Sequence, residues 1–230
     1  MCVADGTMPS KKRRKEADES SEVQDEPRGK RLASETAAAS VDASYESIDG
    51  YAIARSAKQQ QRSQGIFLEG IQYGEIKPSS FATALEWLDP KPDERFIDLG
   101  SGTGKAVLTA AATVAFSTAV GVEIMQPLHD AAELALSKSP SLRAKSVRFV
   151  CADALAYPWT TEGYDCIFVS LTCFTDEMVE QIRTASEKLA VGTRLLVTSR
   201  PLESAWLKLL KRDTLPYGKG SLTFIAYEKV

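Results

Sequence analysis

Three glycines at alternate positions constrain this chain more than any other feature of its sequence. Gly100, Gly102 and Gly104 follow an apolar run that ends at Asp98 and Leu99, and an amphipathic segment comes directly after them. Glycine lets a ligand approach the backbone closely, and the first turn of a helix presents free N–H groups and a positive dipole end. Strand, glycine loop and helix in this order are typical of the ligand-binding edge of a doubly wound α/β sheet.

From residue 91 onward, apolar runs alternate with amphipathic segments. The expected strands are Arg95–Leu99, Ala119–Val122, Val147–Val150, Asp165–Val169 and Arg194–Thr198, and the expected helices are Lys105–Ala115, Gln126–Leu136 and Asp176–Leu189. Such alternation specifies a parallel sheet covered by helices on both faces. Ser221–Tyr227, after a turn around Gly218 and Gly220, is expected to form a terminal antiparallel hairpin. Residues 91–230 are thus predicted to form one Rossmann-like α/β domain with a mostly parallel seven-stranded sheet.

Residues 45–90 are predicted to form an N-terminal helical segment. Apolar side chains recur at helical spacing from Tyr45 through Ile48 and Tyr51. A second helix is expected to begin near Pro78, because proline suits the first helical position, and to stop before Pro90.

Residues 1–44 are predicted to be a disordered, charged tail. They contain no Phe, Tyr or Trp, so they have little apolar surface to bury. Two basic clusters, Lys11–Lys15 and Arg28–Arg31, flank a twelve-residue acidic spacer. This arrangement is typical of a bipartite nuclear-import signal and also suits contact with DNA phosphates. We therefore expect the protein in the nucleus.

The spacing of the glycines discriminates between ligands. A phosphate-binding P-loop needs a first glycine where Leu99 stands and a Ser or Thr where Ala106 stands. A dinucleotide fingerprint needs its third glycine five residues after the first, whereas Gly104 comes four after Gly100. A carboxylate at Asp98 would repel a pyrophosphate but suits a ligand that carries an ammonium and a sulfonium, as S-adenosylmethionine does.

Two further acids follow the next strands along the chain. Glu123 closes the second strand, where a carboxylate can accept both ribose hydroxyls of that cofactor, and Asp153 follows the third, where it can accept from the adenine amino group. Three acids at the carboxyl ends of successive parallel strands resemble the class I S-adenosylmethionine-dependent methyltransferases over nearly all of residues 90–230.

The segment after the fourth strand, Ser170–Phe174, reports on the methyl acceptor. It lacks the Asn/Asp-Pro-Pro-aromatic tetrad that amino-group methylases of adenine or glutamine carry. Cys173 does not follow a proline, so it is interpreted as a small buried cysteine and not as the nucleophile of a cytosine-ring methylase.

Upstream, Tyr73-Gly74-Glu75 precedes the helix expected at Pro78, which lies about twenty residues before the glycine loop. Together with the glycine loop and Gly121-Val122-Glu123, it resembles the disruptor-of-telomeric-silencing family of histone methyltransferases. These enzymes lack a SET domain and methylate lysine 79 of histone H3 on the nucleosome. The resemblance spans residues 73–230 and implies histone H3 in nucleosomes as the partner.

The resemblance also implies roles for particular residues. Tyr73 and Glu75 would close over the methionine end of the cofactor, and Lys105 would lie beside it in place of the usual glutamine. Ser170 stands where the family has an asparagine, and Ala154 where it has a phenylalanine that packs on adenine. The residues implied in the aromatic channel for the substrate lysine are Ser170, Phe174, Tyr217 and Phe224.

Other functions remain open at this point. A class I methyltransferase acting on another protein, on RNA or on a small molecule is the first alternative, and a module that binds the cofactor without catalysis is the second. No zinc or other metal site is expected, because the four cysteines form no C-x-x-C pair and His129 is the single histidine. No apolar run reaches the roughly 18 residues of a membrane span, so no membrane association is expected.

Overall fold

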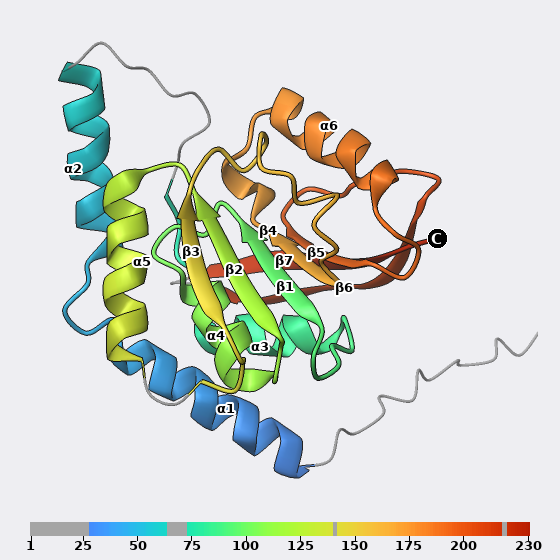
Figure 1. Cartoon of the computed structure of the whole chain (residues 1–230), viewed down its shortest axis with the longest axis horizontal. Helices are drawn as coiled ribbons and strands as arrows, with labels where there is room; N and C mark the ends of the chain where they lie inside the picture. The colour runs from blue at the N-terminus through green and yellow to red at the C-terminus, as the bar shows by residue number, and fades with distance from the viewer. Residues whose placement is uncertain (1–27, 64–72, 140–141, 218–219) are drawn as a thin grey trace, which may run out of the picture.

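A computed structural model describes residues 28–63, 73–139, 142–217 and 220–230 of the protein (Figure 1). The α-helices are α1 Arg28–Ala43, α2 Gly50–Ser63, α3 Pro78–Glu86, α4 Lys105–Thr113, α5 Gln126–Lys138 and α6 Asp176–Ala185. Two single 3₁₀ turns are η1 Leu171–Cys173 and η2 Ser186–Lys188. The strands are β1 Arg95–Leu99, β2 Thr118–Glu123, β3 Val147–Cys151, β4 Cys166–Val169, β5 Arg194–Thr198, β6 Leu207–Tyr217 and β7 Gly220–Lys229.

The strands form one seven-stranded sheet in the order β3-β2-β1-β4-β5-β7-β6. β1 to β5 run parallel, and β7 and β6 close one edge as an antiparallel hairpin. This confirms the predicted mostly parallel sheet with a terminal hairpin. The central strands begin and end within one residue of their predicted bounds, because each is a short apolar run between clear turn residues.

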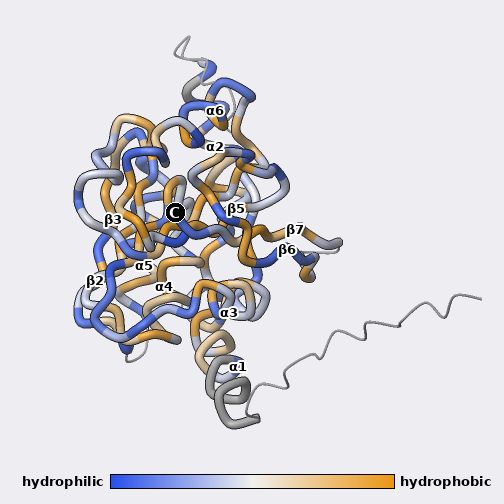
Figure 2. The backbone as a smooth tube through the Cα atoms, turned by 90° about the vertical axis from the view of Figure 1, so that its right-hand side faces the viewer, coloured by the Kyte–Doolittle hydropathy of each residue, from blue (hydrophilic) through white to orange (hydrophobic). Residues whose placement is uncertain are grey.

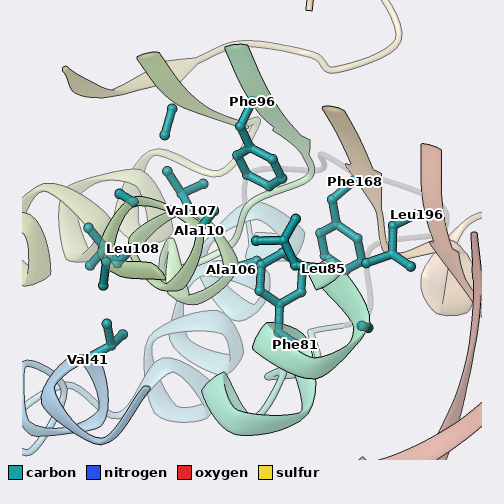
Figure 3. Close-up of a cluster of buried hydrophobic side chains, with 14 of the residues drawn as sticks. Val41, Phe81, Leu85, Phe96, Ala106, Val107, Leu108, Ala110, Phe168 and Leu196 are labelled. Atoms are coloured by element: carbon teal, nitrogen blue, oxygen red, sulfur yellow. The ribbon is translucent and has the colours of Figure 1, made fainter. Parts of the chain in front are cut away.

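Helices cover both faces of the sheet, as predicted, because neighbouring residues of each central strand point to opposite sides. On β4, Phe168 joins a core cluster with side chains of α1, α3, α4 and α5, whereas Ile167 joins a second cluster with side chains of α6. Figure 3 shows the first cluster, in which Phe81 and Leu85 of α3 meet Phe96 and Phe168 of the sheet. The hydropathy colouring of Figure 2 likewise concentrates apolar residues along the inner strands and α4.

Helices α3, α4, α5 and α6 all begin where the sequence predicts a start, and two of these starts have a clear local cause. Pro78 occupies the first turn of α3, where its missing N–H leaves no helical hydrogen bond unmade. The Thr175 hydroxyl accepts from the Met178 N–H and so caps α6, and the α6 prediction needs one adjustment because its last turn is the 3₁₀ segment η2. Within the residues described, no helix combines the length and the apolar character that crossing a bilayer requires.

The prediction that residues 1–44 are all disordered is wrong for residues 28–43, which form α1. Its alanine-rich face lies against α3 and α4, where Ala38 and Val41 are buried (Figures 1 and 3). Alanine has the highest helix propensity, and burial against two other helices supplies the remaining stabilisation. The basic cluster Arg28–Arg31 therefore begins a helix, while Lys11–Lys15 lies outside the described residues.

The start of the next helix also differs from the sequence prediction. Tyr45 and Ile48 are buried in a turn, and α2 begins only at Gly50. The Asp49 carboxylate accepts from the Ala52 N–H at 2.9 Å, which fixes that start. Tyr45 and Ile48 are three residues apart, as on one face of a helix, although both belong to the connection between α1 and α2.

We expect Val41→Ala to destabilise the protein, because the Val41 side chain is fully buried in the core. Losing two methyl groups at about 0.8 kcal/mol each, with a cavity left behind, should lower the free energy of unfolding by about 1.5–3 kcal/mol. Urea unfolding monitored by circular dichroism measures this. Val191→Ala is the matched control, since Val191 is 77% exposed and its truncation should change stability by less than about 0.5 kcal/mol. Equal stability of both variants would show that α1 does not belong to the core.

Candidate functional site

The glycine loop joins β1 to α4 at the carboxyl edge of the sheet. Gly100, Gly102 and Gly104 all have positive φ angles, of 85°, 54° and 83°. A Cβ atom at Gly104 would lie 2.4 Å from the Phe149 ring, so this position requires glycine for space as well as for conformation. The loop is tied to β2, because the Gly100 and Ser101 N–H groups donate to the Val122 carbonyl at 2.8 and 2.9 Å.

Glu123 ends β2, as predicted, and its buried carboxylate organises the loop. One oxygen accepts from the Gly102 N–H and the other from the Met125 N–H, each at 2.8 Å. Burial raises the pKa of Glu123, and these backbone donors oppose the rise by stabilising the charged form. Glu123 thus connects the glycine loop to the start of α5.

Asp98 lies one residue before the end of β1 and is 2% exposed. Its Oδ1 has no hydrogen-bond partner among the described residues, and the same holds for the Ser101 hydroxyl. Burial, reinforced by the negative charge of Glu123, raises the pKa of Asp98 well above its ordinary value. A buried carboxylate without a partner is unfavourable, so this site fits a ligand that brings hydrogen-bond donors or positive charge.

Tyr73, Glu75 and Lys105 form a polar cluster over the glycine loop. The Tyr73 hydroxyl donates to Glu75 Oε1 at 2.7 Å, and Lys105 Nζ pairs with Glu75 Oε2 at 2.6 Å. Since the single phenolic proton is directed at Glu75, the Thr103 hydroxyl donates to the Tyr73 oxygen at 3.0 Å. Burial raises the pKa of Tyr73, which keeps this hydroxyl protonated. The sequence grouped these residues by resemblance, and the structure brings them together.

The N-terminal segment also reaches the loop, which sequence reasoning missed. The buried Tyr45 hydroxyl donates to the Thr103 carbonyl at 2.7 Å, and Lys105 Nζ lies 4.9 Å from the centre of the Tyr45 ring. A Cβ at Gly50 would lie 2.2 Å from the Tyr73 hydroxyl, so α2 also approaches the cluster closely. No local motif signals these contacts, because 58 residues separate Tyr45 from Thr103.

A cavity of about 470 Å³ opens at this edge of the sheet. The predicted site residues that line it are Tyr73, Glu75, Asp98, Gly100, Gly102, Lys105, Glu123, Asp153, Ser170, Phe174 and Tyr217. Residues of six segments far apart in the sequence therefore meet at one place. Gly104, the remaining predicted cofactor-binding residue, does not line the cavity. It belongs to the same loop but faces Phe149 and Ala132 in the core.

The placement of Phe224 in an aromatic channel is wrong. Phe224 is fully buried in the core below the sheet, where its ring packs edge-on against Trp87 at 6.4 Å between ring centres. Residues alternate faces along β7, and Phe224 falls on the face that α3 covers. Tyr217 on β6, which is also predicted for this channel, does line the cavity and lies beside Gly74.

The wall of the cavity that contains Ser170 and Phe174 is built from the end of β4, η1 and the loop after them. Phe174 lies against the glycine loop, 3.7 Å from the position that a Cβ at Gly100 would take. The Arg200 guanidinium donates to the Phe174 carbonyl at 2.9 Å and pairs with Asp176, which holds this loop. Cys173 is only half-buried and lines the cavity, so its interpretation as a buried packing residue needs correction.

Comparison with solved structures places the fold. Magnesium protoporphyrin IX methyltransferase (ChlM) from Synechocystis PCC 6803, solved with bound SAM, superposes with a TM-score of 0.54 over 81% of this chain and 94% of that one, at 12% identity. TrmN from Thermus thermophilus gives 0.51 over 70% and 51%, at 19% identity. The fold is that of the Rossmann-like class I methyltransferases.

The family is defined by sequence. Residues 66–215 match the model of the family described as Histone methylation protein DOT1, and the chain belongs to that family. Family and fold together imply S-adenosylmethionine as the cofactor, and the unpartnered carboxylate of Asp98 fits the positively charged end of such a molecule.

Two curated proteins are similar to parts of the chain. The H3 lysine-79 specific histone-lysine N-methyltransferase of Eremothecium gossypii is 37% identical over 73 residues, which are 32% of this chain and 12% of that protein. A demethylmenaquinone methyltransferase of Roseiflexus sp. is 31% identical over 124 residues, 54% of this chain and 48% of that protein. The chain therefore matches less than half the length of either relative.

The raised pKa of Asp98 has a consequence for stability. The folded, cofactor-free protein retains a proton that the unfolded chain releases at lower pH, so stability should fall as pH rises between the two pKa values. Asp98→Asn should therefore stabilise the cofactor-free protein above this interval, with a gain that disappears in acid. It should weaken binding of S-adenosylhomocysteine by about 1.5–3 kcal/mol, as expected when a hydrogen bond to a charged group is lost.

Thermal unfolding across pH and titration calorimetry measure the two effects. Asp213→Asn is the matched control, because Asp213 is exposed on β6 and neither quantity should change. Unchanged affinity for S-adenosylhomocysteine in Asp98→Asn would contradict the assignment of this carboxylate to the cofactor.

Proposed function

We propose that the protein is an S-adenosylmethionine-dependent protein-lysine methyltransferase that acts on lysine 79 of histone H3 in nucleosomes. The observation that carries this proposal is that the family match over residues 66–215 contains Tyr73, Glu75, the glycine loop and every residue that lines the cavity except Tyr217. The similarity to the Eremothecium gossypii enzyme supports the choice of acceptor.

The cofactor would be held by the acids around the glycine loop. Asp98, Glu75 and Lys105 offer complementary charges to its zwitterionic methionine end, and Asp153 would accept from its adenine amino group. Glu123 uses one lone pair of each carboxylate oxygen for backbone N–H groups, so further acceptor capacity remains for the ribose hydroxyls. The bound cofactor supplies a methyl group on a sulfonium, and the protein aligns the acceptor and excludes water.

The acceptor amine would approach between Ser170, Phe174 and Tyr217. Aromatic rings at this position suit the alkyl stem of a lysine and remove water from its nitrogen. Burial raises the pKa of Tyr217, so its phenol remains neutral and does not compete as an ion-pair partner for the amine. Ser170 stands where the family has an asparagine, so it would contribute a hydroxyl group in place of an amide.

Incubation of the purified full chain with labelled cofactor and nucleosomes, free histones, total RNA or extracted small molecules tests the acceptor. We expect label on nucleosomal histone H3, placed at lysine 79 by mass spectrometry. Label on RNA or another protein would support the first alternative, and the similarity to a demethylmenaquinone methyltransferase makes small molecules a necessary arm. Cofactor binding by calorimetry without transfer to any acceptor would identify a non-catalytic module.

The basic N-terminal residues would supply nuclear import and contact with nucleosomal DNA. The first forty residues contain eight basic and eight acidic side chains, so the remaining chain carries the whole net charge of −3. With α1 counted in the domain, residues 28–230 hold 23 basic and 24 acidic side chains, a net charge of −1, so attraction to DNA would have to come from local cationic segments. In this division, residues 1–27 precede α1, and residues 28–230 form the methyltransferase domain with its N-terminal helices.

Replacing Lys11, Lys12, Arg13, Arg14 and Lys15 together by alanine tests this role without removing α1. Nuclear accumulation should be lost, and nucleosome affinity should depend less on salt, by roughly 0.9 in slope for each lost phosphate contact. Affinity for S-adenosylhomocysteine should not change. A control with Glu16, Asp18 and Glu19 replaced by alanine should remain nuclear. If the cluster variant stays nuclear with an unchanged salt dependence, the tail has neither role.

A further inference from the structure

Four hydroxyl groups form a continuous hydrogen-bonded chain beside the cavity. Ser170 Oγ lies 3.1 Å from Thr198 Oγ1, which lies 3.2 Å from Thr172 Oγ1. Thr172 Oγ1 in turn lies 2.9 Å from Ser199 Oγ. The chain links residues at the carboxyl ends of β4 and β5, 26 to 28 positions apart in the sequence.

The two ends of the chain lie in different surroundings. Ser170 lines the cavity on the acceptor side, whereas Ser199 is exposed. Thr198 in the middle is fully buried, and Thr172 is exposed and also lines the cavity. Ser199 has a φ of 64°, a conformation that is uncommon for residues other than glycine, and its N–H donates to the Thr223 carbonyl at 2.8 Å. The backbone of Ser199 is therefore held in this conformation, and its hydroxyl reaches Thr172 Oγ1.

Methylation of a lysine requires that a proton leave the amine first. A lysine side chain has a pKa of about 10.4, so it is almost wholly protonated at neutral pH, and an ammonium has no lone pair for attack. The apolar wall of the cavity favours the neutral amine, but the released proton still needs a route to solvent. This step rests on the proposed lysine acceptor.

The titratable groups around the acceptor side do not offer an obvious base. They are Cys173 on η1, Tyr217 on β6, Asp98 on β1, and the Arg200–Asp176 pair that links the end of β5 to α6. Tyr51 and Lys58 of α2 act on Tyr217 and Cys173, and Glu75, which also acts on Tyr217, is already paired with Lys105. Burial raises the pKa of both Cys173 and Tyr217, so neither is ionised at neutral pH. Asp98 is fully buried beneath the glycine loop, and Asp176 is already paired with Arg200.

We propose that Ser170, Thr198, Thr172 and Ser199 form a relay that carries the proton of the acceptor ammonium to solvent. The ammonium donates to Ser170 Oγ, which passes its own proton to Thr198, and Thr198 and Thr172 do the same in turn. Ser199 releases a proton to water, so one N–H bond breaks, one proton reaches solvent and every hydroxyl is restored. The neutral amine keeps its lone pair for the methyl group, and rotation of the hydroxyls resets the chain.

Thr198→Val tests the relay, because it removes the central hydroxyl and retains the shape of the side chain. We expect kcat on the lysine acceptor to fall by about 10²-fold, the lower range of what positioned proton transfer contributes. The loss should shrink as pH rises, since more of the amine is then neutral without help. Thr198→Ser should restore activity. Affinity for S-adenosylhomocysteine, measured by calorimetry, should be unchanged in both variants.

Thr193→Val is the matched control, since Thr193 is also buried but lies just before the opposite end of β5. Its activity and pH profile should equal those of the wild type. A less basic acceptor, provided by nucleosomes with thialysine in place of the target lysine, should reduce the effect of Thr198→Val. If Thr198→Val does not fold, Thr172→Val interrupts the same chain at an exposed side chain, and the same outcomes apply.

Two failures are distinguishable. A wild-type protein that methylates no lysine overturns the proposed function and the relay with it. A wild-type protein that methylates lysine while Thr198→Val keeps the same kcat and pH profile overturns the relay alone. A Thr198→Val loss that is constant with pH and is not restored by serine would also overturn it, because packing would then be the cause.

Discussion

The carboxylate of Glu123 determines the shape of the site. It accepts N–H groups from both the glycine loop and the start of α5, so one side chain fixes two elements that would otherwise be joined only through the sheet. The Val122 carbonyl before it takes two more N–H groups from the loop. Three glycines with positive φ can follow this path, and Phe149 behind Gly104 leaves no space for a side chain. Hydrogen bonds to Val122 and Glu123 at the end of β2 thus set the path of the glycine loop along the edge of the cavity.

This arrangement places two carboxylates in a buried position. Burial raises the pKa of both carboxyl groups, and the negative charge of Glu123 raises the pKa of Asp98 further. Glu123 is compensated by backbone donors, while Asp98 has one oxygen without a partner among the described residues. The two hydrophobic clusters on the faces of the sheet provide the stability that tolerates this unfavourable carboxylate. A positively charged ligand end beside Asp98 would favour its ionised form, which agrees with the cofactor implied by the family.

The N-terminal helices complete the site although the family match begins only at residue 66. Tyr45 donates to the glycine loop, and Gly50 lets α2 approach the Tyr73–Glu75 cluster. α1 anchors this segment through Val41 in the core. The short N-terminal region thus supports the glycine loop through these contacts. Its packing against the core therefore influences the geometry of the cavity.

The sequence by itself determined the sheet and its binding edge. Short apolar runs between turn residues specified β1 to β5, and the spacing of Gly100, Gly102 and Gly104 with acids after successive strands specified the ligand class, because strand direction and glycine conformation are local properties. Tertiary packing decided the rest. α1 packs against α3 and α4 and buries Ala38 and Val41, and Phe224 is a core residue because of the face on which β7 presents it. The contacts of Tyr45 and the hydroxyl chain around Thr198 join residues far apart in sequence, and only the folded sheet brings their atoms together.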